Sequence, residues 1–508
     1  MSRRKTLLIL VVLAAAWRLF LVANYHGWEE SDFGNLAMTL GVVKGGFLHY
    51  DMNHLPLYYA VSAAVMTVVG SATVAAIGVS LVSGVGVVAL TYLLAERLFN
   101  RRVALVTSVL AMVQPELALY SASSLREPLY AFALMMTAWL LTSRRGGSGG
   151  AGRLGAAALW AGAAFLTRMD ALLIFPGVAL VQALGEGRGA GERIKALLAM
   201  AIPFAAVVAA WSLYCHFEHG TWQFWGHSVA VNLETGGTVE AEESRLIKGL
   251  MVSGALLFEV IPSRIGWGPF VGYLYTIALV PWRKASSLRV VGLFSILLLG
   301  FWLGVGFVGQ HEPGHNLYWK WLYGVLPLML LFGAAGMLGV VDNLPVSPTA
   351  RQAVLSLVLL QAFFAMLTET RRQVELSEEL LGPQVELARW IEEEVPESTP
   401  MILDNVPERW LSRRDHGRPL HTWMDLPECP DGGQQCTWSA EEFSAWLLEE
   451  EIGWVLWYSE EWTTAPRVAP WLGSGGDWRG EGVTLAMERS SRLDEIDGWA
   501  LYRVEPGR

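Results

Sequence analysis

Long apolar runs along the first 370 residues constrain this chain more than any other feature. Runs of 15–24 apolar residues recur there, and only 17% of the 508 residues are charged, against about 25% in an ordinary soluble protein. About 20 consecutive apolar residues in a helix cross the hydrocarbon core of a bilayer. The pattern predicts a mostly α, polytopic membrane protein. The first run, 7–23, lacks a small-residue cleavage site and is therefore interpreted as an uncleaved helix rather than a signal peptide.

Charge is distributed unevenly between the two parts of the chain. Residues 371–508 contain 28 Asp and Glu against 13 Arg and no Lys, a net charge of −15, so that the first 370 residues carry about +5. An acidic tail argues against nucleic acid as a partner. In the first part, basic residues cluster in short segments, and the positive-inside rule predicts that these are cytoplasmic. The clusters are Arg3–Lys5, Arg97–Arg102, Arg144–Arg153, Arg188–Lys195 and Arg283–Arg289.

A topology follows from these clusters. It has about eleven transmembrane helices, the N-terminus in the cytoplasm and the C-terminus outside it, as in a multi-pass protein of the bacterial inner membrane. A further crossing at the apolar segment 56–70 would put the loop before it and the basic loop after the next helix on the same side of the membrane. The segment is also short, so we expect a juxtamembrane or re-entrant helix there. The expected helices are 7–23, 72–95, 103–120, 128–142, 155–168, 170–184, 196–214, 264–281, 290–308, 321–341 and 352–369.

The sequence also predicts two domains, a transmembrane domain at 1–370 and a soluble extracytoplasmic α/β domain at 371–508. In the tail, "LGPQVELARWIEEEV" and the Ser-capped "SAEEFSAWLLEEE" are typical of helices, whereas "MILDN" and "IGWVLWYS" are typical of strands. "GVTLAMER" and "GWALYRVE" are expected to close the sheet as a pair. Cys429 and Cys436 would form a small disulfide loop if the tail lies outside the cytoplasm.

A long loop is expected at about 215–263, and it raises the question of a metal site. His216, Glu218 and His219 have a spacing that suits zinc. Trp222 and Trp225 instead indicate an aromatic belt at the membrane interface, which we favour. No metal site is assigned.

Several motifs follow one another along the first 370 residues. Asp32 lies in the first outer loop, and "HLPLYY", which begins at His54 and includes Tyr58, follows it. Glu127, beside Arg126, lies in the second outer loop, and "FLTRMD" and "YWKWLYGVLP", with Lys320, come later. In this order they resemble the motifs of the GT-C superfamily of integral membrane glycosyltransferases, which includes protein O-mannosyltransferases and lipid A aminoarabinose transferases. The matching family motifs are an essential Asp, a His/Lys-Pro-Pro-Leu segment, an acidic residue of the second outer loop, a Thr-Arg/Lys step and an Arg-Tyr-x-x-Pro-x-x-Pro helix start.

The resemblance covers roughly residues 7–370 and implies a function. It implies inverting transfer of a sugar from a polyprenyl-phosphate-linked donor, on the extracytoplasmic face, to an acceptor that could be a protein, a lipid or a glycan. Membrane lipids are further partners, and a divalent cation is left open as a cofactor. The chain departs from the family where Phe33 follows Asp32, where Leu55 replaces a Pro, and where Lys320 replaces an Arg. These departures leave the subfamily, and with it the acceptor, undefined.

Such a transfer makes two chemical demands. A base must deprotonate the acceptor as it attacks the anomeric carbon, and Asp32 is the candidate, with Glu127 as the second catalytic residue. Cations must stabilise the departing phosphate, and Lys320, His54, Arg126 and His315 are candidates, with Tyr58 as a further substrate-binding residue. Structural alternatives stay open: Lys320 could reach lipid phosphates, His54 could cap a helix, Arg126 could pair with Glu127, and Arg168 could pair with Asp170.

Two other functions remain alternatives. A transporter or flippase of a lipid-linked sugar would show paired half-repeats and charges near the middle of the membrane, whereas the acidic residues here gather in outer loops. A membrane-anchored binding protein would act through its tail, which has no evident catalytic or nucleotide-binding motif. An Asp32→Asn variant that inserts normally but loses transfer would separate the enzyme from both.

Overall fold

The computed structural model describes most of the chain in two compact units. One unit comprises residues Met1–Gly27 and Met38–Val374, and the other comprises Trp28–Ala37 and Glu375–Arg508. The described residues are 2–25, 35–36, 38–39, 42–43, 55–142, 150–184, 189–219, 222, 242–279, 286–309, 322–396, 398–403, 420–421, 439–458, 472, 477–480, 483–487 and 499–506.

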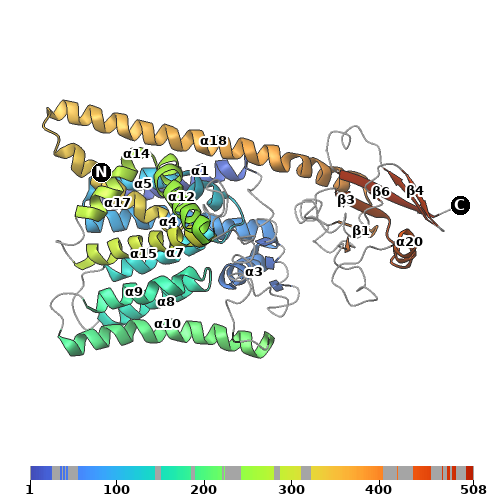
Figure 1. Cartoon of the computed structure of the whole chain (residues 1–508), viewed down its shortest axis with the longest axis horizontal. Coiled ribbons are helices and arrows are strands. Elements are labelled where there is room, and N and C mark those ends of the chain that lie inside the picture. Colours follow the sequence, from blue (N-terminus) through green and yellow to red (C-terminus); the bar gives the residue numbers. More distant parts are fainter. Residues whose placement is uncertain are drawn as a thin grey trace. The chain divides into compact units, whose positions relative to one another are not determined.

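The first unit is a bundle of helices (Figure 1). Helices occupy all eleven predicted segments, with shifted ends. They are α1 (Arg3–Val22), α3 (Leu57–Val69), α4 (Ala72–Leu98), α5 (Arg101–Val113), α6 (Pro115–Leu119), η2 (Tyr120–Ala122), α7 (Glu127–Leu141), α8 (Gly150–Phe165), α9 (Asp170–Ala183), α10 (Ala190–His219), α12 (Glu242–Ala255), the π-helix η3 (Leu256–Val260), α13 (Ile261–Ile265), α14 (Trp267–Leu279), α15 (Ser286–Gly309), α17 (Leu326–Asp342) and α18 (Pro348–Glu394).

Helix length and composition support several membrane crossings. Five helices of the described residues are long and apolar enough to span a bilayer, and the bent pair Arg101–Val113 and Pro115–Ala122 makes a sixth if it is one span. Four shorter apolar helices accompany them, among them α7 and α9. The prediction of a polytopic helical protein is confirmed, whereas the number of eleven crossings stays a prediction.

Two parts of the bundle differ from the expected layout. The expected loop at 215–263 contains α12, η3 and α13. Charged residues interrupt the sequence of α12, so this helix lacks the long apolar run that marked the other helices. Ser253 Oγ donates a hydrogen bond to the carbonyl oxygen of Leu303 at 3.0 Å, and this bond joins α12 to α15. The expected helix 103–120 is broken at Gln114, where Pro115 begins α6 at a bend of 69°.

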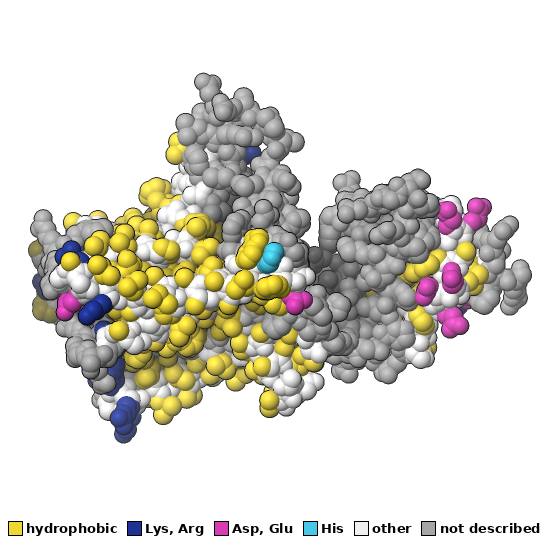
Figure 2. Space-filling model, turned by 90° about the horizontal axis from the view of Figure 1, so that it is seen from below, with side chains coloured by type: hydrophobic (Ala, Val, Ile, Leu, Met, Phe, Trp, Pro, Cys, Tyr) yellow, Lys and Arg dark blue, Asp and Glu magenta, His cyan; other side chains and the backbone are white. Residues whose placement is uncertain are grey.

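The helix ends define two opposite ends of the bundle. At one of them, Arg3 pairs with Glu96 at 2.6 Å, Arg102 pairs with Asp342 at 2.9 Å, and Arg97 donates to Trp139 O at 2.7 Å. These contacts join ends of α1, α4, α5, α7 and α17, and we call this the basic end. In Figure 2 the Lys and Arg side chains of the bundle gather mostly at one end, while its flank is largely hydrophobic. The opposite end, where α1 ends and α7 begins, is the distal end.

The segment of uncertain topology, 56–70, forms helix α3 and a tight turn. Gly70 has a φ of 74°, a left-handed conformation that suits glycine, and the chain turns there into α4. The hydroxyl of Tyr58 lies 3.0 Å from Ala76 O and 3.0 Å from Ser80 Oγ, so that α3 packs against the first part of α4. At 13 residues, α3 is about 20 Å long, too short for an ordinary span.

The second unit is built around a mixed six-stranded sheet. Its strands are β1 (Met401–Ile402), β2 (Leu420–His421), β3 (Trp454–Tyr458), β4 (Trp478–Gly480), β5 (Val483–Met487) and β6 (Trp499–Pro506), in the order β2-β1-β3-β6-β5-β4. β1 runs parallel to both β2 and β3, and the other pairs are antiparallel. The predicted α/β tail is confirmed, including the closing pair β5–β6.

The sheet has a hydrophobic core on each face, as the alternation along β3 requires. Val455 and Trp457 point to one face and pack with Phe443 and Leu447 of helix α20 (Ala440–Glu449). Trp454 and Leu456 point to the other face and pack with Leu387, Trp390 and Ile391. The latter residues belong to α18, so the predicted tail helix is the last part of one helix of 47 residues, and the predicted domain boundary at 370 falls inside it.

Candidate functional site

The bend between α5 and α7 forms the centre of the distal end. Gln114 caps α6, because its side-chain oxygen accepts a hydrogen bond from Leu117 N at 2.7 Å, and Pro115 occupies the first turn where a proline costs no hydrogen bond. α6 and η2 then carry the chain across the end of the bundle to Glu127 at the start of α7. This bend places Glu116 and Glu127 among buried residues, at 0% and 2% exposure.

The first group of charges at the distal end is built on Arg168. Its Nη1 lies 2.8 Å from Glu127 Oε1 and its Nε lies 3.4 Å from Asp170 Oδ1. The hydroxyl of Tyr130 donates to Asp170 Oδ2, and the guanidinium lies 5.6 Å from the centre of the Tyr130 ring. The ring of Trp302 lies on it as well, at 5.5 Å. A cation is thus fixed between two carboxylates and two aromatic rings.

The local sequence explains why these side chains meet. Glu127 and Asp170 both stand in the first turn of a helix, α7 and α9, where a carboxylate is stabilised by the helix dipole. Arg168 stands in the short break between α8 and α9. The Arg168–Asp170 pair, left open by the sequence, is therefore present. Arg126 also pairs with Glu127, with its Nε 3.9 Å from Glu127 Oε1.

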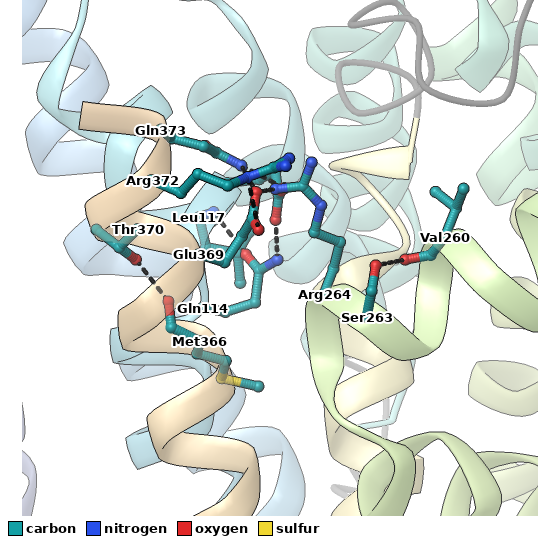
Figure 3. Close-up of polar contacts among 11 residues, drawn as sticks. Gln114, Leu117, Val260, Ser263, Arg264, Met366, Glu369, Thr370, Arg372 and Gln373 are labelled. Carbon is teal, nitrogen blue, oxygen red and sulfur yellow. Dashed lines mark hydrogen bonds and ion pairs between the residues drawn. The ribbon is translucent and has the colours of Figure 1, made fainter. Parts of the chain in front are cut away.

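A second group of charges joins α6, α13 and α18, and Figure 3 shows its side chains converging from these helices. Arg264 Nη1 lies 3.1 Å from Glu116 Oε1 and also pairs with Glu369. Gln373 donates to both carboxylates, at 3.3 Å to Glu116 and 3.1 Å to Glu369. Because Arg372 Nε lies 3.3 Å from Glu369 Oε2, two guanidinium groups balance two carboxylates.

A third group surrounds Arg18, which is fully buried in α1. Its Nε donates to Ser121 Oγ at 3.1 Å, its Nη1 to Ala14 O at 3.2 Å and its Nη2 to Leu117 O at 3.2 Å. The hydroxyl of Tyr323 donates to the same Leu117 carbonyl at 3.3 Å, and its ring stacks on Tyr120 with 5.5 Å between centres. These bonds hold the α6–η2 bend between α1 and the start of α17.

The predicted site residues divide by whether the structure describes them. Asp32, His54, His315 and Lys320 lie outside the described residues, so their roles stay predictions. Arg126 and Glu127 lie together at the distal end. Tyr58 is buried, and its hydroxyl is bonded to α4; its substrate-binding role stays a prediction. Cys429 and Cys436 also lie outside the described residues.

The sequence did not single out Arg18, Glu116, Arg264 or Glu369. The signal that could have found them is a charged residue inside or beside an apolar run, which in a membrane protein marks a functional site by default. Arg18 is such a residue in "LAAAWRLFLV", and Glu116 follows a Gln-Pro helix break.

Among the described residues, no group of three or more His, Cys, Asp or Glu side chains could hold a metal ion. The His216 ring stacks on Trp222 at 4.1 Å between centres, and the aromatic belt stays a prediction. The divalent cation that the sequence left open stays untested.

Comparisons with known proteins match this architecture. The sequence model of the family described as dolichyl-phosphate-mannose-protein mannosyltransferase matches residues 53–214. A comparison with curated protein sequences finds no match. Among solved structures, ArnT from Cupriavidus metallidurans, in the apo state and bound to undecaprenyl phosphate, aligns with a TM-score of 0.60 at 11% identity, over 99% of this chain and 98% of that one.

A second solved structure is similar in fold. The oligosaccharyltransferase AglB from Archaeoglobus fulgidus, in complex with an inhibitory peptide and a dolichol-phosphate, aligns with a TM-score of 0.55 at 12% identity, over 100% of this chain and 77% of that one. Both proteins are GT-C glycosyltransferases. The chain therefore has the GT-C fold, and the resemblance seen in the sequence is confirmed at the level of the fold.

Proposed function

We propose that the chain is a membrane glycosyltransferase that moves a sugar from a polyprenyl-phosphate-linked donor to an acceptor, with inversion at the anomeric carbon. The GT-C fold carries this proposal, because the similar ArnT structure is bound to undecaprenyl phosphate and the similar AglB structure contains a dolichol-phosphate. The sugar is a hexose or a pentose, and the acceptor is a protein, a lipid or a glycan.

The reaction would take place at the distal end of the bundle. Basic segments are retained on the cytoplasmic side of bacterial membranes. Since Arg3, Arg97 and Arg102 share the basic end, the distal end would face the exterior, where Glu127 and Arg168 lie. The N-terminus would be cytoplasmic and the tail domain extracytoplasmic, as in a protein of the bacterial inner membrane.

The predicted site residues suit the two demands of the transfer. Asp32 would take the proton from the acceptor, which needs a carboxylate that is ionised near neutral pH. Lys320, His54 and Arg126 would stabilise the leaving phosphate. Glu127 would position the acceptor, because its carboxylate is fixed by Arg168 at 2.8 Å. Tyr58 and His315 would border the donor.

The experiment compares surface glycans by mass spectrometry in cells that produce the protein, the Asp32→Asn variant, the Glu127→Gln variant or no protein. We expect one glycan species to depend on the protein. Loss of a general base costs about 100- to 10,000-fold in rate, so Asp32→Asn should abolish that species. Glu192→Gln, an exposed carboxylate on α10, is the matched control and should leave it unchanged. A glycan profile that does not change when the protein is absent would refute the proposal.

A further inference from the structure

An apolar groove lies between α5 and α18 in the helical unit. Its volume is about 490 Å³, which lies within the range of small-molecule sites in proteins. Leu105 and Val109 line it from α5, and Leu359, Leu360 and Phe363 line it from α18. Figure 1 shows α18 running along the bundle with α5 beneath it.

The groove exists because α18 packs closely against α14. A Cβ atom at Gly268 of α14 would lie 2.2 Å from Val358 Cγ1, and a Cβ atom at Gly266 would lie 2.9 Å from Ala362 Cβ. The two glycines thus let α18 approach α14. The next face of α18, which carries Leu359, Leu360 and Phe363, borders the groove, and Leu360 is 50% exposed there.

Charged side chains stand at the end of the groove that is nearer the basic end. Arg102 precedes Leu105, Val106 and Val109 by three, four and seven residues, so it lies on the same face of α5. Its side chain is 48% exposed, and its Nη1 donates to both oxygens of Asp342, at 2.9 and 3.0 Å.

The turn after Asp342 brings a second guanidinium to this place. Arg351 Nε donates to Leu344 O at 3.0 Å, two residues beyond Asp342. Arg102 thus contacts Asp342, Arg351 contacts the turn that follows it, and these three charges sum to one net positive charge. A phosphodiester with one negative charge balances it.

We propose that this groove binds an anionic phospholipid, with one acyl chain between α5 and α18 and its phosphate beside Arg102. The position of the groove below Arg102 agrees with an acyl chain below its phosphate, because Leu105 to Leu110 lie about 4 to 12 Å further along α5 than Arg102. The occupant comes from the leaflet at the basic end, and phosphatidylglycerol has the required charge. Phosphatidylcholine has the same acyl chains and no net charge, so it lacks the headgroup charge that this site selects.

The first test measures lipid retention by native mass spectrometry of the full chain, purified and then supplied with phosphatidylglycerol or phosphatidylcholine. We expect phosphatidylglycerol to be retained and phosphatidylcholine to be lost. In Arg102→Gln the retention should fall about tenfold, the order of one charge-assisted hydrogen bond. Arg4→Gln, an exposed arginine of α1, is the matched control and should behave like the unaltered protein. Equal retention of the two lipids would overturn the proposal.

The second test locates the acyl chain in the unaltered protein, so it does not depend on a variant that folds. Phosphatidylglycerol with a photoreactive group in one acyl chain should label peptides that contain residues 105–110 and 356–363. Leu359→Trp fills the groove and should remove that labelling, whereas Val82→Trp, at a position 70% exposed on α4, should not. Labelling spread evenly over the exposed helices would show that the lipid contacts are general and would refute a defined site.

Discussion

At the scale of single residues, the buried carboxylates of Glu127 and Asp170 in the helical unit lie within ion-pair distance of Arg168. Arg168 contacts two carboxylates, and its side chain is only 9% exposed. Burying a charge is costly unless it is paired, so the removal of one partner leaves the others unbalanced. The stabilising free energy of this group therefore depends on all of its residues together rather than on one bond.

Replacing Arg168 by Met should destabilise the protein, because Glu127 and Asp170 would then be buried without their guanidinium. The expected loss is about 3–5 kcal/mol, measured as a fall in the thermal unfolding temperature in detergent. The double variant Arg168→Met with Glu127→Gln should recover part of this loss. Additive effects of the two changes would contradict the coupling.

Glu442 allows a prediction for pH in the second unit. Its carboxylate accepts a hydrogen bond from Ser439 N at 2.9 Å, and this bond lowers the pKa of Glu442 below its ordinary value of 4.5. A lowered pKa in the folded state means that the stabilisation is present above the ordinary pKa and is lost as the pH falls through the lowered value.

The Glu442→Gln change removes that charge at neutral pH. Hydrogen–deuterium exchange of the peptide that covers α20 (Ala440–Glu449) should then become faster in the full chain. Glu441→Gln is the control, since Glu441 stands in the same turn and takes no part in the capping box. Equal exchange rates in the two variants would show that the capping bond contributes nothing.

At the scale of elements, glycines set how closely the helices approach. A Cβ atom at Gly84 of α4 would lie 2.2 Å from Ser121 Oγ and 3.1 Å from Arg18 Nε. Gly84 thus makes room for the bonds between Arg18 and the α6–η2 bend. Gly78, on the same helix, has open space around the position of its Cβ atom.

Gly84→Ala should therefore destabilise the protein by about 1–3 kcal/mol through overpacking. Gly78→Ala should leave the stability unchanged or raise it, because alanine favours a helix by about 1 kcal/mol over glycine. Thermal unfolding of both variants in the same detergent tests the pair. If both lower the unfolding temperature equally, the close approach at Gly84 is not the cause.

Element positions follow largely from the sequence, whereas their contacts do not. Apolar runs located the helices, because a bilayer requires long apolar segments, and the capping Ser439 marked the start of α20. The helix α12 was missed because it lacks such a run. The pairing of Arg264 with Glu116 and Glu369 joins residues 148 and 105 positions apart in the chain, and local patterns carry no signal for such distances.

At the scale of the whole molecule, the GT-C fold and the distribution of charged groups between the two ends of the bundle support the proposed sugar transfer. Charged groups built on Arg18, Arg168 and Arg264 lie at the distal end, and Arg3, Arg97 and Arg102 lie at the basic end. A sugar transferase that uses a lipid-linked donor needs this polarity, since the donor headgroup and the acceptor meet at one face of the membrane. A flippase would move the lipid-linked sugar without breaking its phosphate bond.

The most direct measurement is the release of polyprenyl phosphate by the purified protein in liposomes that contain a labelled polyprenyl-phosphate sugar and an acceptor extract. The account predicts that one polyprenyl phosphate is freed for each sugar transferred, and that Asp32→Asn lowers both amounts together by about 100-fold or more while Glu192→Gln does not. Movement of the intact lipid-linked sugar across the bilayer without release of polyprenyl phosphate, or full transfer by Asp32→Asn, would contradict it.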